Sequence, residues 1–191
     1  MNQRQSIQRI TRLGILIAII FLMTFVPNLG YIQTGLLSIT TIHIPVIIGS
    51  AILGPVGGLV LGTTWGITSF LKVLSMPSTI ETAIFLNPMV SIFPRILVGL
   101  IISYTTIGLG KLIKNKDLKY ALVAAVGTLS NTVLVLSAMF IFAQGGVLSF
   151  NQAFSVIITV IISTNGLLEL ISAVILVPII IRAISKVIPQ S

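Results

Sequence analysis

Two ionisable side chains, Arg95 and Glu169, stand inside long apolar stretches of this 191-residue sequence. An ionisable group at the centre of a membrane helix costs roughly 2.5–3.5 kcal/mol, so it normally faces protein or water. Small and polar residues recur at helical spacing in three such stretches: Ser91, Arg95, Gly99 and Ser103; Ala124, Thr128 and Asn131; and Asn165, Glu169 and Ser172. Residues three or four apart share a helix face. Three polar faces therefore predict one shared polar interior.

The chemistry of this set is recognition. A guanidinium forks onto a carboxylate or phosphate, and Asn amides offer donors and acceptors to hydroxyls and amides. His43 is the only histidine and cysteine is absent, which leaves no metal site, triad or catalytic residue to propose. No Gly-rich loop ending in Lys-Ser or Lys-Thr is present, so an ATPase is not expected either. We expect a binding protein without cofactors, not an enzyme.

Depth follows from a rise of 1.5 Å per helical residue. Arg95 is expected roughly 10 Å, Asn131 about 16 Å and Asn165 about 18 Å below the outer ends of their helices. These three are predicted to line one cavity that opens outward. Glu169, at roughly 24 Å, would form its floor. The other candidate substrate-binding residues are Ser91, Thr128, His43, Tyr31 and Trp65.

Each candidate has a structural alternative. Arg95 would pair with Glu169 or extend toward the interface, and a protonated Glu169 would bond a neighbouring helix. The two Asn side chains would join helices, His43 would be a buried structural imidazole, and Tyr31 would belong to the interfacial aromatic belt. The alternatives stay open at this point.

The elements that hold these residues are predicted membrane helices. The chain has 11 basic and 3 acidic residues, 55% hydrophobic residues and a mean hydropathy of +1.16. Charged residues make up 7% of this chain, whereas they make up about 25% of a soluble domain. A membrane-spanning helix needs about 20 residues, so we predict an all-α integral membrane protein, one domain over residues 1–191 with six spans. The expected spans are 10–27, 43–53, 55–72, 88–110, 119–142 and 153–182.

Charge positions predict the topology. Nine of the 11 basic residues lie at the two tails or in the 111–119 loop, so those segments and both termini are expected to be cytoplasmic. Pro27 and Asn28 follow the first apolar run where a cleavage site would stand, so it is predicted to be an uncleaved span. The outer loops are expected at about 28–42, 73–87 and 143–152, with Lys72 and Glu81 near the second. The net charge of +8 thus indicates membrane topology and no nucleic-acid partner.

Small residues at four-residue spacing predict close helix contacts. The longest series is Gly54, Gly58, Gly62 and Gly66, for which packing within the bundle is the favoured interpretation. Ala121 and Ala125 form a shorter pair. Gly14 and Ala18 form another, on a span with few other polar residues, where contact with a different subunit is the alternative.

These features together resemble the S components, the substrate-binding membrane subunits of energy-coupling factor (ECF) vitamin transporters. The resemblance covers the whole chain. It rests on the basic residues before the first span, the segment His43-Ile-Pro-Val-Ile-Ile-Gly49, the following Leu53-Gly54-Pro55, and Phe93-Pro94-Arg95. The pattern is most similar to the pantothenate-specific member; cobalamin and pyridoxine-type members have similar second helices.

The resemblance implies a high-affinity vitamin-binding subunit in the bacterial cell membrane. It implies a transmembrane T component and two cytoplasmic ATPases as partners, which drive its reorientation in the membrane. In the family an Ala-x-x-x-Ala motif of the first helix contacts the T component, and the matching positions here are Gly14 and Ala18. Arg95 would hold the vitamin carboxylate, and Asn131 and Asn165 would hydrogen-bond the hydroxyls and the amide of the vitamin. The rival hypotheses are a biotin-binding member, since biotin is also a monoanion, and a self-sufficient proton-coupled transporter using Glu169.

Overall fold

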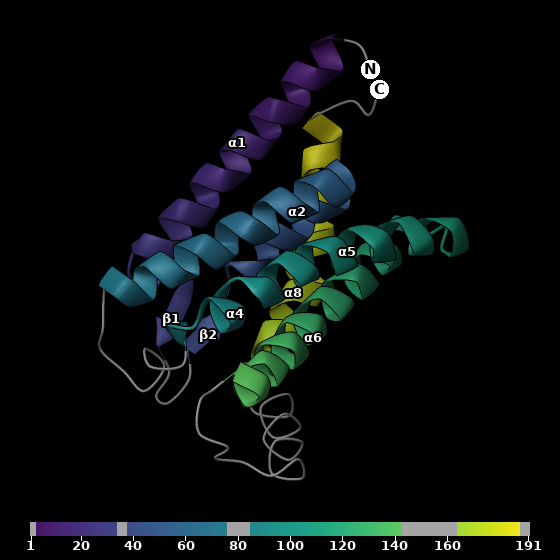
Figure 1. Cartoon of the computed structure of the whole chain (residues 1–191). Helices are drawn as coiled ribbons and strands as arrows, with labels where there is room; N and C mark the ends of the chain where they lie inside the picture. Colours follow the sequence, from purple (N-terminus) through teal and green to yellow (C-terminus); the bar gives the residue numbers. More distant parts are fainter. Residues whose placement is uncertain (1–2, 34–37, 76–84, 143–163, 188–191) are drawn as a thin grey trace.

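The computed structural model describes residues 3–33, 38–75, 85–142 and 164–187. These residues form a helical bundle with one small β-hairpin at one end (Figure 1). The elements in chain order are α1 (Gln3–Phe25), β1 (Tyr31–Gln33), β2 (Ser38–Thr40), α2 (His43–Ser75), α4 (Pro88–Ser91), α5 (Phe93–Leu112), α6 (Lys116–Phe142) and α8 (Thr164–Val187).

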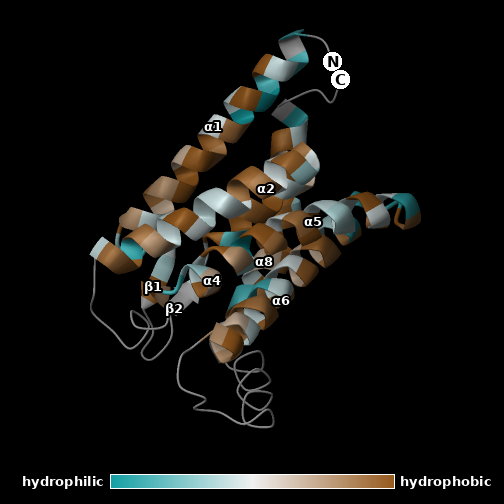
Figure 2. Cartoon of the chain, viewed as in Figure 1, coloured by the Kyte–Doolittle hydropathy of each residue, from teal (hydrophilic) through white to brown (hydrophobic). Residues whose placement is uncertain are grey.

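Within the described residues, five helices are long and apolar enough to cross a bilayer. Apolar residues cover most of the helix surfaces, and hydrophilic residues gather at the first turns of α1 and at the turn between α5 and α6 (Figure 2). An outward-facing apolar surface of this extent is normal only where lipid covers it. The chain is therefore a multi-pass membrane protein, as its composition predicts.

The long helix α2 consists of two arms that fold back on each other at Gly54. Gly54 has φ 73° and ψ −166°, a left-handed conformation that glycine adopts without steric cost, and Pro55 then opens the second arm. A side chain at Gly49 would collide with Leu61, so the arms lie against each other. The guanidinium of Arg9 on α1 donates to the Leu53 carbonyl at 2.8 Å, which satisfies an acceptor at the end of the first arm.

The glycine series binds the second arm of α2 to α5. A side chain at Gly58 would strike the backbone of Gly99, one at Gly62 the backbone of Arg95, and one at Gly66 the backbone of Ile92. Packing inside the bundle, the interpretation favoured from sequence, is thus correct for these three positions. Gly54 instead serves the turn and has no atom near its missing side chain.

The region between α1 and α2 differs from the prediction. The expected outer loop at 28–42 contains an antiparallel hairpin in which Tyr31 pairs with Thr40 and Ile32 with Ile39. Its strands have three residues each, too few for a period-two pattern to be recognised. Residue Thr41 closes the hairpin by donating its backbone N–H to Gly30 at 2.9 Å.

Helix boundaries also differ from those predicted. Helix α1 begins at Gln3, well before residue 10, because a helix continues past its apolar segment when the flanking residues are good helix formers. The predicted span 88–110 is divided at Ile92 into α4 and α5. Of the predicted span 153–182, residues 153–163 lie outside the described residues, as do Glu81 and the loop 143–152.

The first turn of α1 and the last turn of α8 lie at the same end of the bundle, opposite the hairpin (Figure 1). Near this end Arg182 of α8 forms an ion pair with Asp117 of α6 at 3.6 Å. The basic tail and the basic 111–119 loop, which the charge pattern assigns to one side of the membrane, therefore meet.

Candidate functional site

Arg95 is 6% exposed and lies near the hairpin end of α5. Its Nη1 donates to the carbonyl of Val90 at 2.5 Å. That carbonyl stands four residues before Pro94, which has no N–H and so cannot form the usual helical hydrogen bond with it. The side chain of Arg95 replaces the missing donor. Local backbone chemistry therefore holds the guanidinium in place, and its Nε has no hydrogen-bond partner among the described residues.

Two aromatic rings flank this guanidinium. Its central carbon lies 5.6 Å from the ring centre of Trp65 on α2 and 5.1 Å from that of Phe85. Cation–π attraction at these distances stabilises the charge where water is excluded. Ser91 donates its hydroxyl to the Phe85 carbonyl, which fixes the segment that carries this ring. Phe85 lies in the predicted loop 73–87, where nothing in the sequence indicates its role.

Several buried polar atoms near this level have no hydrogen-bond partner among the described residues. They are Arg95 Nε, Trp65 Nε1, Thr128 Oγ1 and Asn131 Oδ1, and Ser50 Oγ is a further one farther along α2. An unsatisfied buried polar atom costs about 1–3 kcal/mol. Native proteins tolerate few of them, and a group of them commonly marks a place where a ligand or water completes the bonding.

Helix contacts place Asn131 and His43 at one depth. A side chain at Gly127 on α6 would touch both Ile47 on α2 and Ile102 on α5. One helical turn, or about 5.4 Å, from that contact toward the hairpin leads to Asn131 on α6 and to His43 on α2. Helix α4, which precedes Arg95, packs against both α5 and α6. These candidates thus lie in the hairpin half of the bundle.

Tyr31 joins the hairpin to the same region. Its hydroxyl forms a 2.7 Å hydrogen bond with Ser69 Oγ, one turn of α2 beyond Trp65. The ammonium of Lys72 lies 3.7 Å from the centre of the Tyr31 ring. Tyr31 therefore packs onto α2 through both its ring and its hydroxyl, and covers the side of the bundle nearest Trp65.

Glu169 lies against the hairpin, not at the predicted floor of the cavity. Its Oε1 accepts a hydrogen bond from the backbone N–H of Thr40 at 2.5 Å. Thr40 ends strand β2, so this bond places the carboxylate at the hairpin end of the bundle. In the described part of the chain Glu169 makes no ion pair with Arg95, since the two side chains bond to Thr40 and Val90.

The remaining candidates divide by location. The backbone of Asn165 lies in the first turn of α8, and its side chain lies outside the described residues. Gly14 and Ala18 are exposed on α1, and nothing within 4 Å would meet a side chain at Gly14. The opposite face of α1 packs against the core through Leu13, Leu16 and Ile17. The Gly14 and Ala18 face is therefore uncovered.

Comparison with known proteins assigns the chain to a family. The family model described as "ECF transporter, substrate-specific component" matches residues 8–181. The pantothenic acid transporter PanT of Lactococcus lactis subsp. cremoris is 35% identical over 162 residues, which cover 77% of this chain and 78% of the relative. The pantothenate transporter PanT of Leuconostoc mesenteroides subsp. mesenteroides is 31% identical over 172 residues, which cover 76% and 83%. This chain belongs to the substrate-specific component family of ECF transporters and is a transport subunit, not an enzyme.

Proposed function

We propose that this chain binds pantothenate from outside the cell and is the vitamin-recognising subunit of an ATP-driven importer. The observation that carries the proposal is the buried Arg95 guanidinium, fixed by Val90 between Trp65 and Phe85. Pantothenate is a small hydrophilic monoanion, and its carboxylate suits the N–H groups that Arg95 has left. The names of the two relatives support the choice of vitamin.

The rest of the vitamin would satisfy the polar atoms that lack partners. Its hydroxyls and amide match the hydroxyl of Thr128 and the amide of Asn131, which offer donors and acceptors at the same level. Asn165 remains a proposed contact from the start of α8. His43 and Ser91 would border the site, and Tyr31 and Trp65 would close it on the α2 side. Glu169 would act by holding the hairpin against α8.

We also propose the membrane arrangement and the partners. Counting the two arms of α2 separately gives six crossings, and both termini then lie in the cytoplasm, in one transmembrane domain over residues 1–191. The membrane is the bacterial cytoplasmic membrane. A T component would contact the exposed Gly14 and Ala18 face, and two ATPases would drive inward reorientation. Family membership supports this division of labour.

Calorimetric titration of the purified chain tests the proposal. Pantothenate is expected to bind, whereas panthenol, in which an alcohol replaces the carboxylate, is expected to bind at least about 100-fold more weakly, because a buried charge pair is worth several kcal/mol. Arg95→Gln should lose the preference for the acid, while Arg12→Gln, an exchange on α1 away from the site, should keep it. Equal binding of acid and alcohol would refute the role of Arg95.

A vitamin panel and reconstitution separate the rival functions. Thermal shifts with biotin, cobalamin and pyridoxine are expected to be absent, and a shift with one of them in place of pantothenate would reassign the substrate. Proteoliposomes that hold the chain alone should show no gradient-driven uptake. Accumulation driven by a proton gradient without partners would instead support a secondary transporter.

A further inference from the structure

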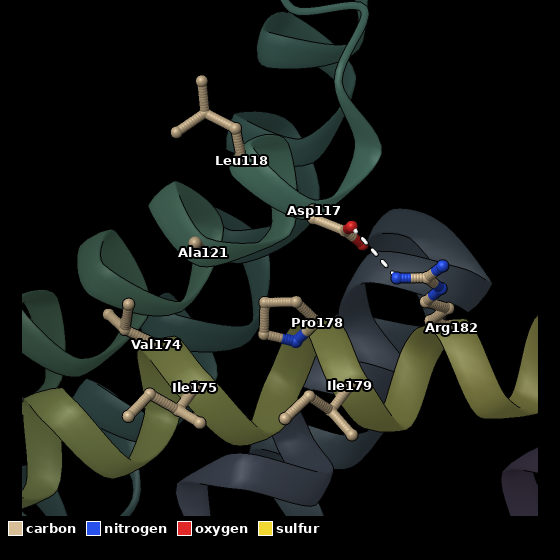
Figure 3. Close-up of a pocket in the computed structure, with 8 residues that line it drawn as sticks. All are labelled: Asp117, Leu118, Ala121, Val174, Ile175, Pro178, Ile179 and Arg182. Carbon is tan, nitrogen blue, oxygen red and sulfur yellow. Dashed lines mark ion pairs between the residues drawn. The ribbon is translucent and has the colours of Figure 1, made fainter.

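A lipid-facing hollow lies between α6 and α8, far from the candidate vitamin site. It has a volume of about 360 Å³ and is lined by Asp117, Leu118, Ala121, Val174, Ile175, Pro178, Ile179 and Arg182. Six of these eight residues are apolar, and the two charged ones form the ion pair shown at one end of the hollow in Figure 3. The site thus has an apolar body and a charged head.

The shape follows from two residues with little bulk. Ala121 is half-buried on α6 and has only a methyl group to place between the helices, and the compact ring of Pro178 faces it from α8 (Figure 3). Leu118, Ile175 and Ile179 at the margins are 51%, 53% and 58% exposed. A bilayer-exposed hollow with such a lining is filled by hydrocarbon, since water gains no polar partner there.

The charged end favours an anion. The side chains of Arg182 and Asp117 are 68% and 57% exposed, and a single ion pair this open is held weakly. The Arg182 guanidinium has five N–H donors, of which an ion pair at 3.6 Å occupies few. The surrounding end of the bundle is basic, with Lys111, Lys114, Lys116, Lys119 and Lys186 against Asp117 as the one acid of these segments.

The apolar body and the charged end of the hollow lie a short distance apart along α8. From Ile175 to Arg182 is seven residues, or about 10 Å of helix, which takes the occupant from the hydrocarbon to the interface where headgroup phosphates lie. Basic pockets between membrane helices on the cytoplasmic side are suited to anionic headgroups. An acyl chain in the hollow with a phosphate at Arg182 satisfies both ends together.

We propose that this hollow is a binding site for one anionic phospholipid, with an acyl chain against Ala121 and Pro178 and the phosphate on Arg182. The site uses the small residue Ala121, for which the vitamin site has no role. It also leaves the Gly14 and Ala18 face of α1 unoccupied. The inference does not depend on which vitamin the chain binds.

Native mass spectrometry of the full chain, released from bilayers that contain equal phosphatidylglycerol and phosphatidylcholine, tests the proposal. The wild type is expected to retain one phosphatidylglycerol in preference to phosphatidylcholine. Arg182→Gln should reduce that preference about fivefold, the effect expected for one basic residue at a membrane surface. Arg182→Lys should keep most of it, and Lys111→Gln, a matched charge loss outside the hollow, should leave it unchanged.

A second pair of variants tests the acyl-chain part. Ala121→Phe fills the hollow and should abolish retention of either lipid, whereas Leu122→Phe adds bulk at the neighbouring position outside it and should not. Equal retention of the two lipids by the wild type would overturn the proposal. The proposal would also be overturned if Lys111→Gln lost as much lipid preference as Arg182→Gln, or if Leu122→Phe lost as much lipid as Ala121→Phe. The effect would then be general to the surface. Unfolding temperatures equal to that of the wild type, measured without any vitamin, establish that the bundle is intact in all variants.

Discussion

The guanidinium of Arg95 donates to the carbonyl of Val90, the acceptor that Pro94 leaves without a backbone donor. The proline and the arginine that follows it therefore act together: one opens a gap in the helical hydrogen bonds and the other closes it with its side chain. The sequence Phe93-Pro94-Arg95 fixes the orientation of the charge before any ligand arrives.

Pro94→Ala should loosen this arrangement. A backbone N–H at position 94 is able to bond Val90 and would release the arginine side chain, so we expect a more stable helix and pantothenate affinity roughly two- to tenfold lower, the cost of ordering one long side chain. Calorimetry and thermal unfolding measure both effects. Pro178→Ala on α8 is the control, with similar helix stabilisation and unchanged affinity. Unchanged affinity in Pro94→Ala would show that Val90 does not orient Arg95.

Thr128→Val and Asn131→Leu should separate stability from binding. Both remove buried polar atoms that lack partners among the described residues, so the ligand-free protein is expected to be as stable as wild type or more stable. Pantothenate affinity should fall about tenfold for each lost hydrogen bond inside the bundle. Thermal unfolding with and without pantothenate measures both quantities.

Ser103→Ala is the matched control for these two variants. The Ser103 hydroxyl bonds the carbonyl of Gly99 at 2.9 Å and that of Ser50 at 3.1 Å. Its removal should lower the unfolding temperature and leave the ligand-induced shift intact. If Thr128→Val destabilises the ligand-free protein as Ser103→Ala does, then the Thr128 hydroxyl bonds another protein group and is not a ligand contact.

Glu169→Ala should free the hairpin. The carboxylate accepts from the Thr40 backbone N–H, and without it we expect amide hydrogen exchange at residues 38–42 to rise about tenfold or more, as for the loss of a hydrogen bond to a charged group. Glu169→Gln keeps an acceptor oxygen, so the amides of residues 38–42 should exchange much more slowly in this variant than in Glu169→Ala. Equal exchange in the two variants would mean that the negative charge, not the hydrogen bond, holds the hairpin.

Gly62→Ala should separate α2 from α5. The added methyl group would collide with the backbone of Arg95, and we expect a loss of about 1–3 kcal/mol in unfolding free energy from overpacking. Gly108→Ala on α5 meets nothing within 4 Å and should gain roughly 0.5–1 kcal/mol from reduced backbone freedom. Urea or heat denaturation in detergent compares the two. A neutral Gly62→Ala would show that the helices tolerate a wider spacing.

Gly14→Leu combined with Ala18→Leu should disrupt partner assembly alone. Both positions are exposed on α1, so the variant is expected to fold and to bind pantothenate as wild type does. Copurification with the T component should fall strongly, because bulky side chains prevent close helix approach. Gly108→Leu provides a control with one added leucine at an exposed position of α5. Intact assembly of the double variant would move the partner surface elsewhere.

The sequence predicts the membrane helices well because apolar length and charge clustering are local signals. The Gly54-Pro55 break is likewise visible, since these two residues interrupt helices by their own geometry. The hairpin at 31–40 and the bond between Glu169 and Thr40 are not visible. They depend on three-residue strands and on contacts between segments far apart in the chain.

The candidate site shows the same division. Arg95 stands out as a charge in an apolar segment, and Thr128 and Asn131 stand out by helical spacing. The aromatic ring of Phe85 does not, because its position over Arg95 depends on the conformation of a loop. Whether Asn165 contributes remains a prediction.

The contact of Gly62 with the backbone of Arg95 has a kinetic consequence. With no side chain between them, the second arm of α2 packs directly on the backbone of α5, and the bond to Val90 holds the guanidinium against these two helices. Under the proposed function the site is then preorganised, and the Arg95 side chain loses little rotational freedom when it binds an anion. Differences in affinity among anions should consequently be expressed in residence time more than in the rate of capture.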